Sequence, residues 1–250
     1  MGIQRVKFFR LIISYDGTDY SGWQRQKNAQ NTIVGTLEST FERAFGRACV
    51  IIGASRTDAG VHAQGQLARV QVDFDISAHE LDRAWAHLLP PDIVIRDIQP
   101  VSNEWHPIRD AQQKTYQYTI YTVRPDPFVA RYGWYWNRAL DVSKLCAIAP
   151  IFMGTHDFRS FTTGHEAYPD TIRTIDAITI DYFNNNKILI TVQGGSFLRY
   201  MIRRIVGACV LVASDQKKSI DSVRAILERR DPRTHLLTAP AQGLTLTSVI

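Results

Sequence analysis

The stretch CVIIGASRTDAGVHAQGQLARVQVDF, residues 49–74, contains the clearest structural pattern in the chain. It begins with an apolar run at 49–53, which is typical of a buried strand. It ends at 66–74 with a regular alternation of residues, which indicates a strand that exposes one face to water. The polar segment 55–62 is therefore expected on a loop held by two rigid elements, a common place for functional groups.

The elements around this stretch complete a β-α-β-β-α-β order, which is typical of a ferredoxin-like α+β unit. Turn and capping signals set the limits of each element. The expected elements are a strand at 7–15, a helix that Asn31 or Thr32 opens and Gly46 closes, a helix opened by a Ser77/Glu80 capping box and stopped by Pro90 and Pro91, and a strand at 93–98.

The second half repeats the theme with a different sequence. It predicts strands at 115–123, 173–183, 187–192 and 244–249, a turn at Asn184–Asn186, and helices at 141–152, at 197–213 and from a Ser219 cap through Leu227. The fold class expected is α+β, with an N-terminal domain 1–106, a C-terminal domain 107–250, mainly antiparallel sheets and a binding cleft where the halves meet.

Composition narrows the class of partner. The 250 residues carry a net charge of +5, with a pI of about 9.2, which favours a polyanionic partner. The three cysteines form no C-x-x-C pair, which argues against a disulfide framework and favours a reducing cytosol. No signal peptide and no apolar run of membrane-spanning length is visible, so the chain is expected to be soluble, cytoplasmic and unanchored.

Asp58 is the only carboxylate within residues 55–62, and it is the first candidate for catalysis. Gly60 follows it and permits a backbone conformation closed to other residues. The alternative is an Asx-turn, in which the Asp58 side chain accepts a hydrogen bond from its own backbone.

A second cluster lies on the strand at 115–123. Tyr116 and Tyr118 fall on one strand face and Tyr121 on the other. Aromatic rings on a strand stack on unpaired bases with about 1–3 kcal/mol each. The alternative is ordinary core packing, which is the commoner role of aromatic strand residues.

A third cluster runs from Arg199 to Arg204. Arg199 and Arg203 are four residues apart and are expected to share a helix face. Arg203 borders an apolar stripe, so burial there would require an anion. Arg204 is expected at the surface or against a phosphate.

Metal and nucleotide cofactors are not predicted. The seven histidines show no metal-ligand spacing, and residues 73–75 lack the glycine and glutamate of a calcium loop. The Gly194-Gly195 pair does not match a phosphate-binding loop.

Several motifs together resemble the tRNA pseudouridine synthase A family, in order over nearly the whole chain. The run Arg56–His62 (RTDAGVH) is the most specific of them. The others are YDG at 15–17, GWQRQ at 22–26, KTYQY at 114–118, Phe197 with MIRRIVG at 201–207, and QGL at 242–244.

The resemblance implies a cofactor-free isomerase, dimeric, that converts uridine to pseudouridine at positions 38, 39 and 40 of the tRNA anticodon arm. It implies that Asp58 is the catalytic aspartate and that Tyr116 stacks on the target uracil. It also implies that Arg203 keeps the aspartate ionised and that Arg56 helps to displace the base. Two departures from the family pattern are WHPIR at 105–109 and Ser55, which stands where a glycine is usual.

Two other classes fit parts of the sequence. One is a non-catalytic RNA-binding module that reads single strands through aromatic sheet faces. The other is a metal-dependent phosphoesterase using Asp16, Asp58 or Asp73, although the sequence lacks the ligand spacing such a site needs.

Overall fold

The chain forms two compact units, and each is described by itself. The computed structural model describes residues 6–26, 28, 31–183 and 186–250. Unit 1 comprises residues 1–112 and 246–250, and unit 2 comprises residues 113–245. The sequence predicted a domain boundary after residue 106 and assigned residues 246–250 to the second domain.

Contacts near the C-terminus explain why residues 246–250 belong to unit 1. The Gln112 N–H donates to the carbonyl of Ile250, with 2.6 Å between nitrogen and oxygen. Gly65 lies so close to the last strand that a Cβ atom on it would be 2.6 Å from the Thr247 carbonyl oxygen. The last residues of the chain are therefore held by the first unit.

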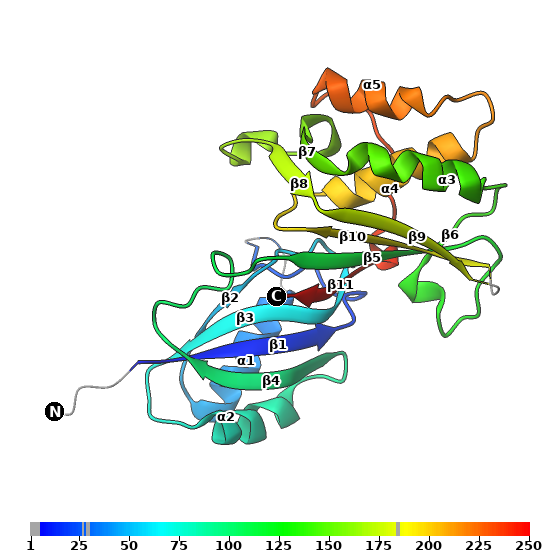
Figure 1. The fold of residues 1–250 in the computed structure, drawn as a ribbon. Coiled ribbons are helices and arrows are strands. Elements are labelled where there is room, and N and C mark those ends of the chain that lie inside the picture. Colours follow the sequence, from blue (N-terminus) through cyan, green and yellow to red (C-terminus); the bar gives the residue numbers. More distant parts are fainter. Residues whose placement is uncertain (1–5, 27, 29–30, 184–185) are drawn as a thin grey trace. The chain divides into compact units, whose positions relative to one another are not determined.

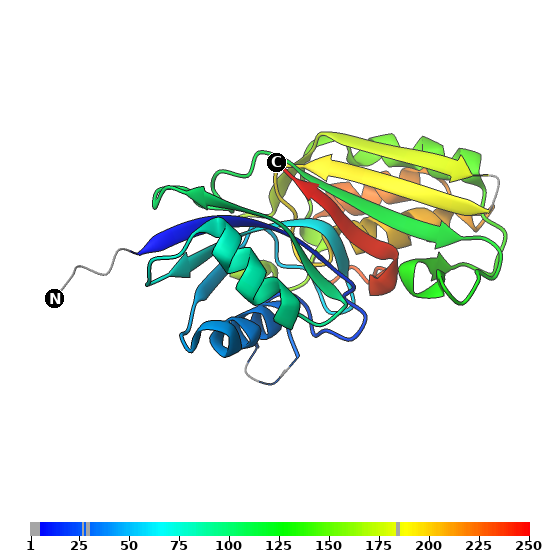
Figure 2. The same cartoon turned by 90° about the horizontal axis from the view of Figure 1, so that it is seen from below.

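Unit 1 has the strand order of a ferredoxin-like sheet. Its pairing order is β4-β1-β3-β2, and every neighbouring pair is antiparallel. Figures 1 and 2 show both helices on one face of this sheet. The elements are β1 (Lys7–Tyr15), α1 (Ile33–Phe45), β2 (Val50–Gly53), β3 (His62–Val72), α2 (Ala78–Trp85), a 3₁₀ turn (Ala86–Leu88) and β4 (Ile93–Val101).

The core of unit 1 lies where the helices meet the sheet. Leu11 and Ile13 alternate with less buried neighbours along β1 and are fully buried. The rings of Phe41 on α1 and Trp85 on α2 meet edge to face, with 5.2 Å between centroids. The Trp85 indole N–H also donates to the Thr40 hydroxyl at 3.0 Å, so the buried polar atom has a partner.

The predicted start and end of α1 and the predicted start of α2 are confirmed, whereas α2 ends at Trp85 and a 3₁₀ turn at Ala86–Leu88 separates it from the Pro90 and Pro91 expected to stop it. The Thr32 hydroxyl accepts from the Gly35 N–H at 3.2 Å at the start of α1, and Gly46 ends the helix with φ of 63°. Ser77 and Glu80 form the complete capping box of α2. These signals depend on neighbouring residues only, which is why the sequence was sufficient.

Unit 2 is also α+β, and Figure 1 shows α3 and α4 against one face of its sheet, with α5 outside them. Strand β10 pairs antiparallel with β5 and with β9, and β6 pairs parallel with β5. Its helices and strands are β5 (Lys114–Tyr121), β6 (Trp134–Tyr135), α3 (Val142–Ile148), β7 (Gly154–Asp157), β8 (Ile172–Ile175), β9 (Ala177–Phe183), β10 (Lys187–Gly194), α4 (Met201–Ala213), α5 (Asp221–Arg229) and β11 (Leu244–Val249), which runs past the unit boundary. Its 3₁₀ turns are Ala130–Tyr132, Ala149–Phe152, Arg159–Phe161, His165–Ala167 and Ala241–Gly243.

Three predicted elements of unit 2 were wrong in extent. The strand at 173–183 is two strands, because the Asp176 N–H donates to the Gln193 carbonyl at 2.8 Å while β8 pairs with β7. The α-helix at 141–152 ends at Ile148, and the following 3₁₀ turn contains Pro150, which has no N–H to donate. The helix at 197–213 begins only at Met201, because Tyr200 has a φ of 61°.

Two further results concern turns and membranes. Asn184 and Asn185 of the predicted turn lie outside the described residues, and Asn186 has a φ of 57°. Within the described part of the chain, no helix is both long and apolar enough to cross a membrane.

Candidate catalytic loop and substrate-binding residues

Residues 54–61 form the loop that carries Asp58, between β2 and β3. The Ala54 N–H donates to the Leu67 carbonyl at 2.7 Å, which closes the loop at its base. The Gln66 side chain, fully buried on β3, binds both polar groups of the Ser55 backbone. Its oxygen accepts from the Ser55 N–H at 3.2 Å, and its nitrogen donates to the Ser55 carbonyl at 2.6 Å.

We expect Gln66→Leu to destabilise unit 1, because it leaves the Ser55 N–H and carbonyl without their partner. The free energy of unfolding should fall by about 1–3 kcal/mol, measured by urea denaturation. Gln66→Glu should cost more than Gln66→Leu, because it places a carboxylate at a fully buried position against the Ser55 carbonyl. Gln64→Leu is the matched control, because Gln64 is exposed on the same strand; an equal loss in that variant would contradict the assignment.

The segment carrying the YDG and GW motifs packs directly against this loop. A Cβ atom on Gly17 would lie 2.0 Å from the Val61 carbonyl oxygen, and one on Gly22 would lie 2.7 Å from the Thr57 carbonyl oxygen. Trp23 is buried, and its indole ring packs against Gly53. A Cβ atom on Gly53 would lie 2.5 Å from that ring. The glycines are therefore needed for close approach of two backbones.

Hydrogen bonds fix this packing. The hydroxyl groups of Tyr15 and Thr57 lie 2.8 Å apart in a buried position. The Trp23 N–H donates to the Thr57 carbonyl at 3.1 Å. The Gly17 N–H donates to Nδ1 of the buried His62 at 3.1 Å. The residues on both sides of Asp58 are thus bound to the strand β1 and to the segment that follows it.

Asp58 itself is half-buried, and Arg56, two residues earlier, is exposed. The turn at this point is closed by the main chain, because the Asp58 carbonyl accepts from the Val61 N–H at 3.1 Å. The Gly60 N–H donates to the Tyr20 carbonyl at 3.2 Å. Main-chain hydrogen bonds therefore close this turn.

Tyr116 lies on β5 in unit 2, and the predicted face assignment is confirmed. Tyr116 and Tyr118 share the buried face of the strand, and Tyr121 lies on the other face. The Tyr116 and Phe197 rings meet edge to face, with 5.4 Å between centroids. Tyr118 donates to the Pro240 carbonyl at 2.8 Å and serves as a core residue, and its burial raises the pKa of its phenol.

Arg203 lies in the first turn of α4 and is half-buried. Its Nε donates to the Ala239 carbonyl at 2.7 Å, and its guanidinium lies over the Tyr200 ring at 5.0 Å. The Arg199 guanidinium lies over the same ring at 4.8 Å, and its Nη2 donates to the Tyr200 hydroxyl at 3.1 Å. The guanidinium groups of both arginines therefore contact the Tyr200 ring.

One prediction for this cluster was wrong, and one of the two alternatives for Arg204 was wrong. Arg199 precedes α4, so it does not share a helix face with Arg203. Arg204 is half-buried and not plain surface, because its Nη1 donates to the Thr162 carbonyl at 2.9 Å and burial lowers the pKa of its guanidinium. A phosphate contact at Arg204 stays a prediction.

The predicted site residues therefore fall into two groups. Arg56 and Asp58 share one loop of unit 1, and Tyr116 and Arg203 lie on a strand and a helix of unit 2. Sequence reasoning missed Gln66 and gave no role to Lys114, although the alternation of β5 places Lys114 on the buried Tyr116 face.

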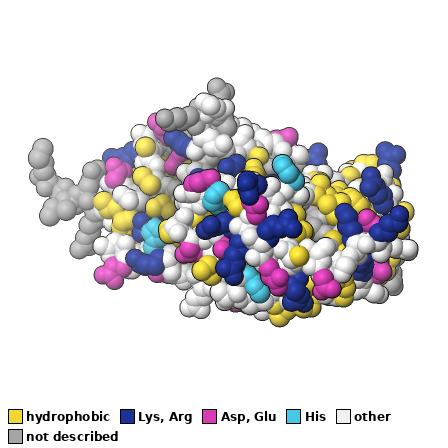
Figure 3. Space-filling model, turned by 90° about the horizontal axis from the view of Figure 1, so that it is seen from above, with side chains coloured by type: hydrophobic (Ala, Val, Ile, Leu, Met, Phe, Trp, Pro, Cys, Tyr) yellow, Lys and Arg dark blue, Asp and Glu magenta, His cyan; other side chains and the backbone are white. Residues whose placement is uncertain are grey.

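On the surface drawn in Figure 3, Lys and Arg side chains gather in groups with acidic side chains among them. Among the described residues, no group of three or more His, Cys, Asp or Glu could hold a metal ion.

Comparison with known proteins identifies the class of this molecule. A family profile described as tRNA pseudouridine synthase matches residues 11–108 and 148–250. The tRNA pseudouridine synthase A of Pseudothermotoga lettingae is 38% identical over 245 residues, covering 98% of this chain and 99% of that protein. The enzyme of the same name from Clostridium kluyveri is also 38% identical, with the same coverage. The chain therefore belongs to the tRNA pseudouridine synthase family.

A solved structure gives a much weaker match. The crystal structure of the archaeal box H/ACA sRNP Nop10-Cbf5 complex has 12% sequence identity and a TM-score of 0.35. The match covers 84% of this chain and 43% of that chain.

Proposed function

We propose that this chain isomerises uridine to pseudouridine in tRNA, with Asp58 as the catalytic carboxylate. The observation that supports this most directly is the loop 54–61, whose residues on both sides of Asp58 are bound to strands β1 and β3 and to the segment that follows β1. A side chain held by rigid neighbours is suited to a reaction.

The reaction breaks the N1–C1′ glycosidic bond and forms a C5–C1′ bond. C5 loses a proton and N1 gains one, so the product is an isomer of the substrate and no cofactor is consumed. Asp58 must be ionised to act in this reaction as nucleophile or base. Removing the uracil from its stack costs a few kcal/mol, and stacking on Tyr116 offsets part of that cost.

The two arginines complete the proposed machinery. Arg203 is proposed to keep the Asp58 carboxylate ionised, because a positive charge favours the charged form of a carboxyl group. Arg56, exposed beside Asp58 in sequence, is proposed to help displace the target base. Both roles follow the family resemblance of the RTDAGVH and MIRRIVG motifs.

The proposed targets are positions 38, 39 and 40 in the anticodon arm, and the proposed acting form is a cytoplasmic homodimer that needs no metal or organic cofactor. Dimerisation is tested by light scattering of the purified chain, which should give twice the mass of 28.4 kDa. A monomeric mass would contradict this part of the proposal.

Tritium release tests the reaction and its site together. A tRNA transcript labelled at C5 of uridine should release tritium to water when treated with the protein, because C5 loses its hydrogen in the reaction. A second transcript with cytidine at 38, 39 and 40 should release none. Equal release from both transcripts would contradict the target assignment, and no release from either would contradict the activity.

A further inference from the structure

Lys114 is a buried cation at the start of β5. Its side chain lies on the same strand face as Tyr116 and Tyr118, and the residue is only 7% exposed. Lysine is almost never buried to this degree without a partner, because removing a charge from water is costly.

No hydrogen bond or ion pair joins the Lys114 ammonium to any residue that the structure describes. The neighbouring acidic residues are bound to other groups. Asp176 accepts from the Gln113 side chain at 3.1 Å, and Asp170 pairs with Nη1 of Arg173 at 3.1 Å. The buried charge of Lys114 is therefore not neutralised by these two carboxylates.

A second cation, Arg173, acts on the Lys114 ammonium. Gly194 on β10 pairs with Lys114, and a Cβ atom on Gly194 would lie 2.6 Å from the Thr174 carbonyl oxygen of β8. Arg173 is the residue before Thr174, so it lies on the strand that packs against the β10 residue paired with Lys114. Burial first, and then the charge of Arg173, lower the pKa of the Lys114 ammonium.

Arg173 also has unused hydrogen-bonding capacity. Its Nε is buried and has no hydrogen-bond partner among the described residues. Two neighbouring cations, each with polar capacity left over, form an arrangement that an anion would stabilise. Arg173 offers a planar set of donors and Lys114 a point charge, which is a combination suited to phosphate.

We propose that Lys114 and Arg173 form a phosphate-binding site that takes a backbone phosphate of the RNA substrate. The position fits a polynucleotide, because Lys114 is two residues from Tyr116 on the same strand face, about 7 Å along the strand. A phosphate next to the target uridine would then be held while the base lies at Tyr116. This inference rests on the proposed function for the identity of the substrate.

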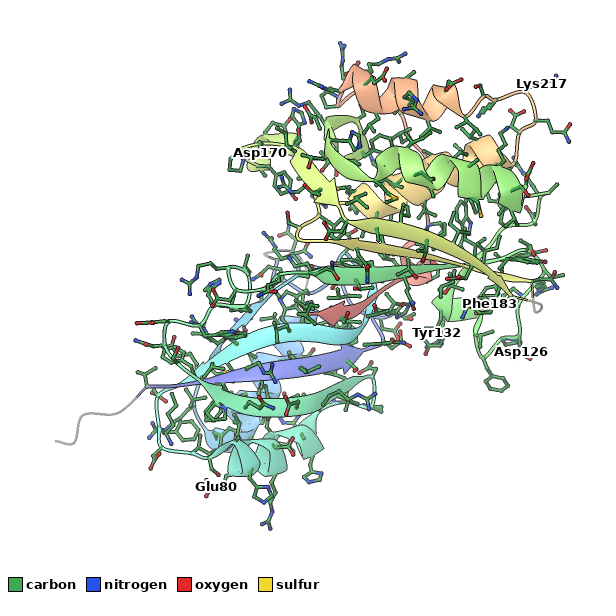
Figure 4. All side chains as sticks on the ribbon, in the orientation of Figure 1. Glu80, Asp126, Tyr132, Asp170, Phe183 and Lys217 are labelled. Atoms are coloured by element: carbon green, nitrogen blue, oxygen red, sulfur yellow. The ribbon has the colours of Figure 1, made fainter. Side chains whose placement is uncertain are left out.

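The test is the salt dependence of binding to an unmodified tRNA transcript. The variant Lys114→Met removes the charge and keeps the length of the side chain. Lys217→Met is the matched control, because Lys217 is exposed on the α4–α5 connection, and Figure 4 shows it on the opposite side of unit 2 from Asp170. The slope of log Kd against log salt should fall by about 0.7–0.9 for one lost phosphate contact.

The expected result is this loss of slope in Lys114→Met and in Arg173→Met, with Lys114→Arg close to the unchanged protein. Without bound RNA, the Lys114→Met variant should also unfold at a higher temperature than the unchanged protein, because an uncompensated buried charge is removed. If Lys114→Met fails to fold, Arg173→Met gives the same measurement. An unchanged slope in the folded variants, or an equal loss in Lys217→Met, would overturn the proposal.

Failure of this inference is distinguishable from failure of the proposed function. Binding slopes are measured without turnover, whereas the activity is measured by tritium release. A protein that releases tritium normally but shows no change of slope in either variant would retain its function and lose only the phosphate site.

Discussion

Replacing Asp58 with alanine should abolish pseudouridine formation while leaving the fold and tRNA binding in place. The turn at 58–61 is closed by the main-chain carbonyl of residue 58, and alanine keeps that carbonyl. The loop is also held by Gln66, Tyr15 and Trp23, none of which needs the carboxylate for the bonds described above. The rate should therefore fall by roughly 10⁴-fold or more, as expected for a group that takes part in the chemistry.

The control for this variant is Asp19→Ala. Asp19 is an exposed residue of the same unit. Its main-chain carbonyl accepts a hydrogen bond from the Asn31 side-chain amide at 2.6 Å. Both variants remove one negative charge, so a general electrostatic effect on tRNA binding would appear in both. With saturating enzyme, the single-turnover rate of Asp19→Ala should stay near that of the unchanged protein, whereas that of Asp58→Ala should not. Comparable activity in Asp58→Ala would refute the catalytic assignment.

Gly17→Ala should be the most damaging of the small substitutions near the loop. The added methyl group would meet the Val61 carbonyl oxygen at 2.0 Å, and both partners are backbone, so neither moves without shifting its segment. Val61 donates to Asp58, and a shift there displaces the proposed catalytic residue. A displacement of about 1 Å at a reacting group costs roughly 10²-fold in rate, and overpacking costs about 1–3 kcal/mol of stability.

Gly46→Asn is the matched control for Gly17→Ala. A Cβ atom at Gly46 meets nothing within 4 Å, and its φ of 63° is one that asparagine tolerates. Activity and urea denaturation of the two variants should therefore separate clearly. If Gly17→Ala turned over like the control, the close packing of the two backbones would not matter for catalysis.

The parts of the fold that local signals determine could be predicted from the sequence. Thr32, Gly46 and the Ser77/Glu80 box act on their nearest neighbours, and they set the helix ends of unit 1 as expected. The order of elements in that unit followed from the periodicity of apolar residues. The family motifs then pointed to Asp58 before any contact was known.

The errors arose where distant residues decide the outcome. Tyr200 adopts a left-handed conformation beside two guanidinium groups, and its own sequence neighbours fit a continuous helix pattern. Gln66 binds Ser55 across a strand pair, a contact that no spacing rule specifies. Arg204 resembles a surface arginine in sequence, yet the Thr162 carbonyl lies within its reach.

The most direct test of the account is nucleotide-resolution mapping of pseudouridine in one unmodified tRNA treated with the unchanged protein and with Asp58→Asn. This variant keeps the shape of the side chain and removes its charge. We expect pseudouridine at positions 38, 39 or 40 with the unchanged protein and none with Asp58→Asn, although both bind the tRNA. Pseudouridine at the same positions and to the same extent with Asp58→Asn would contradict it.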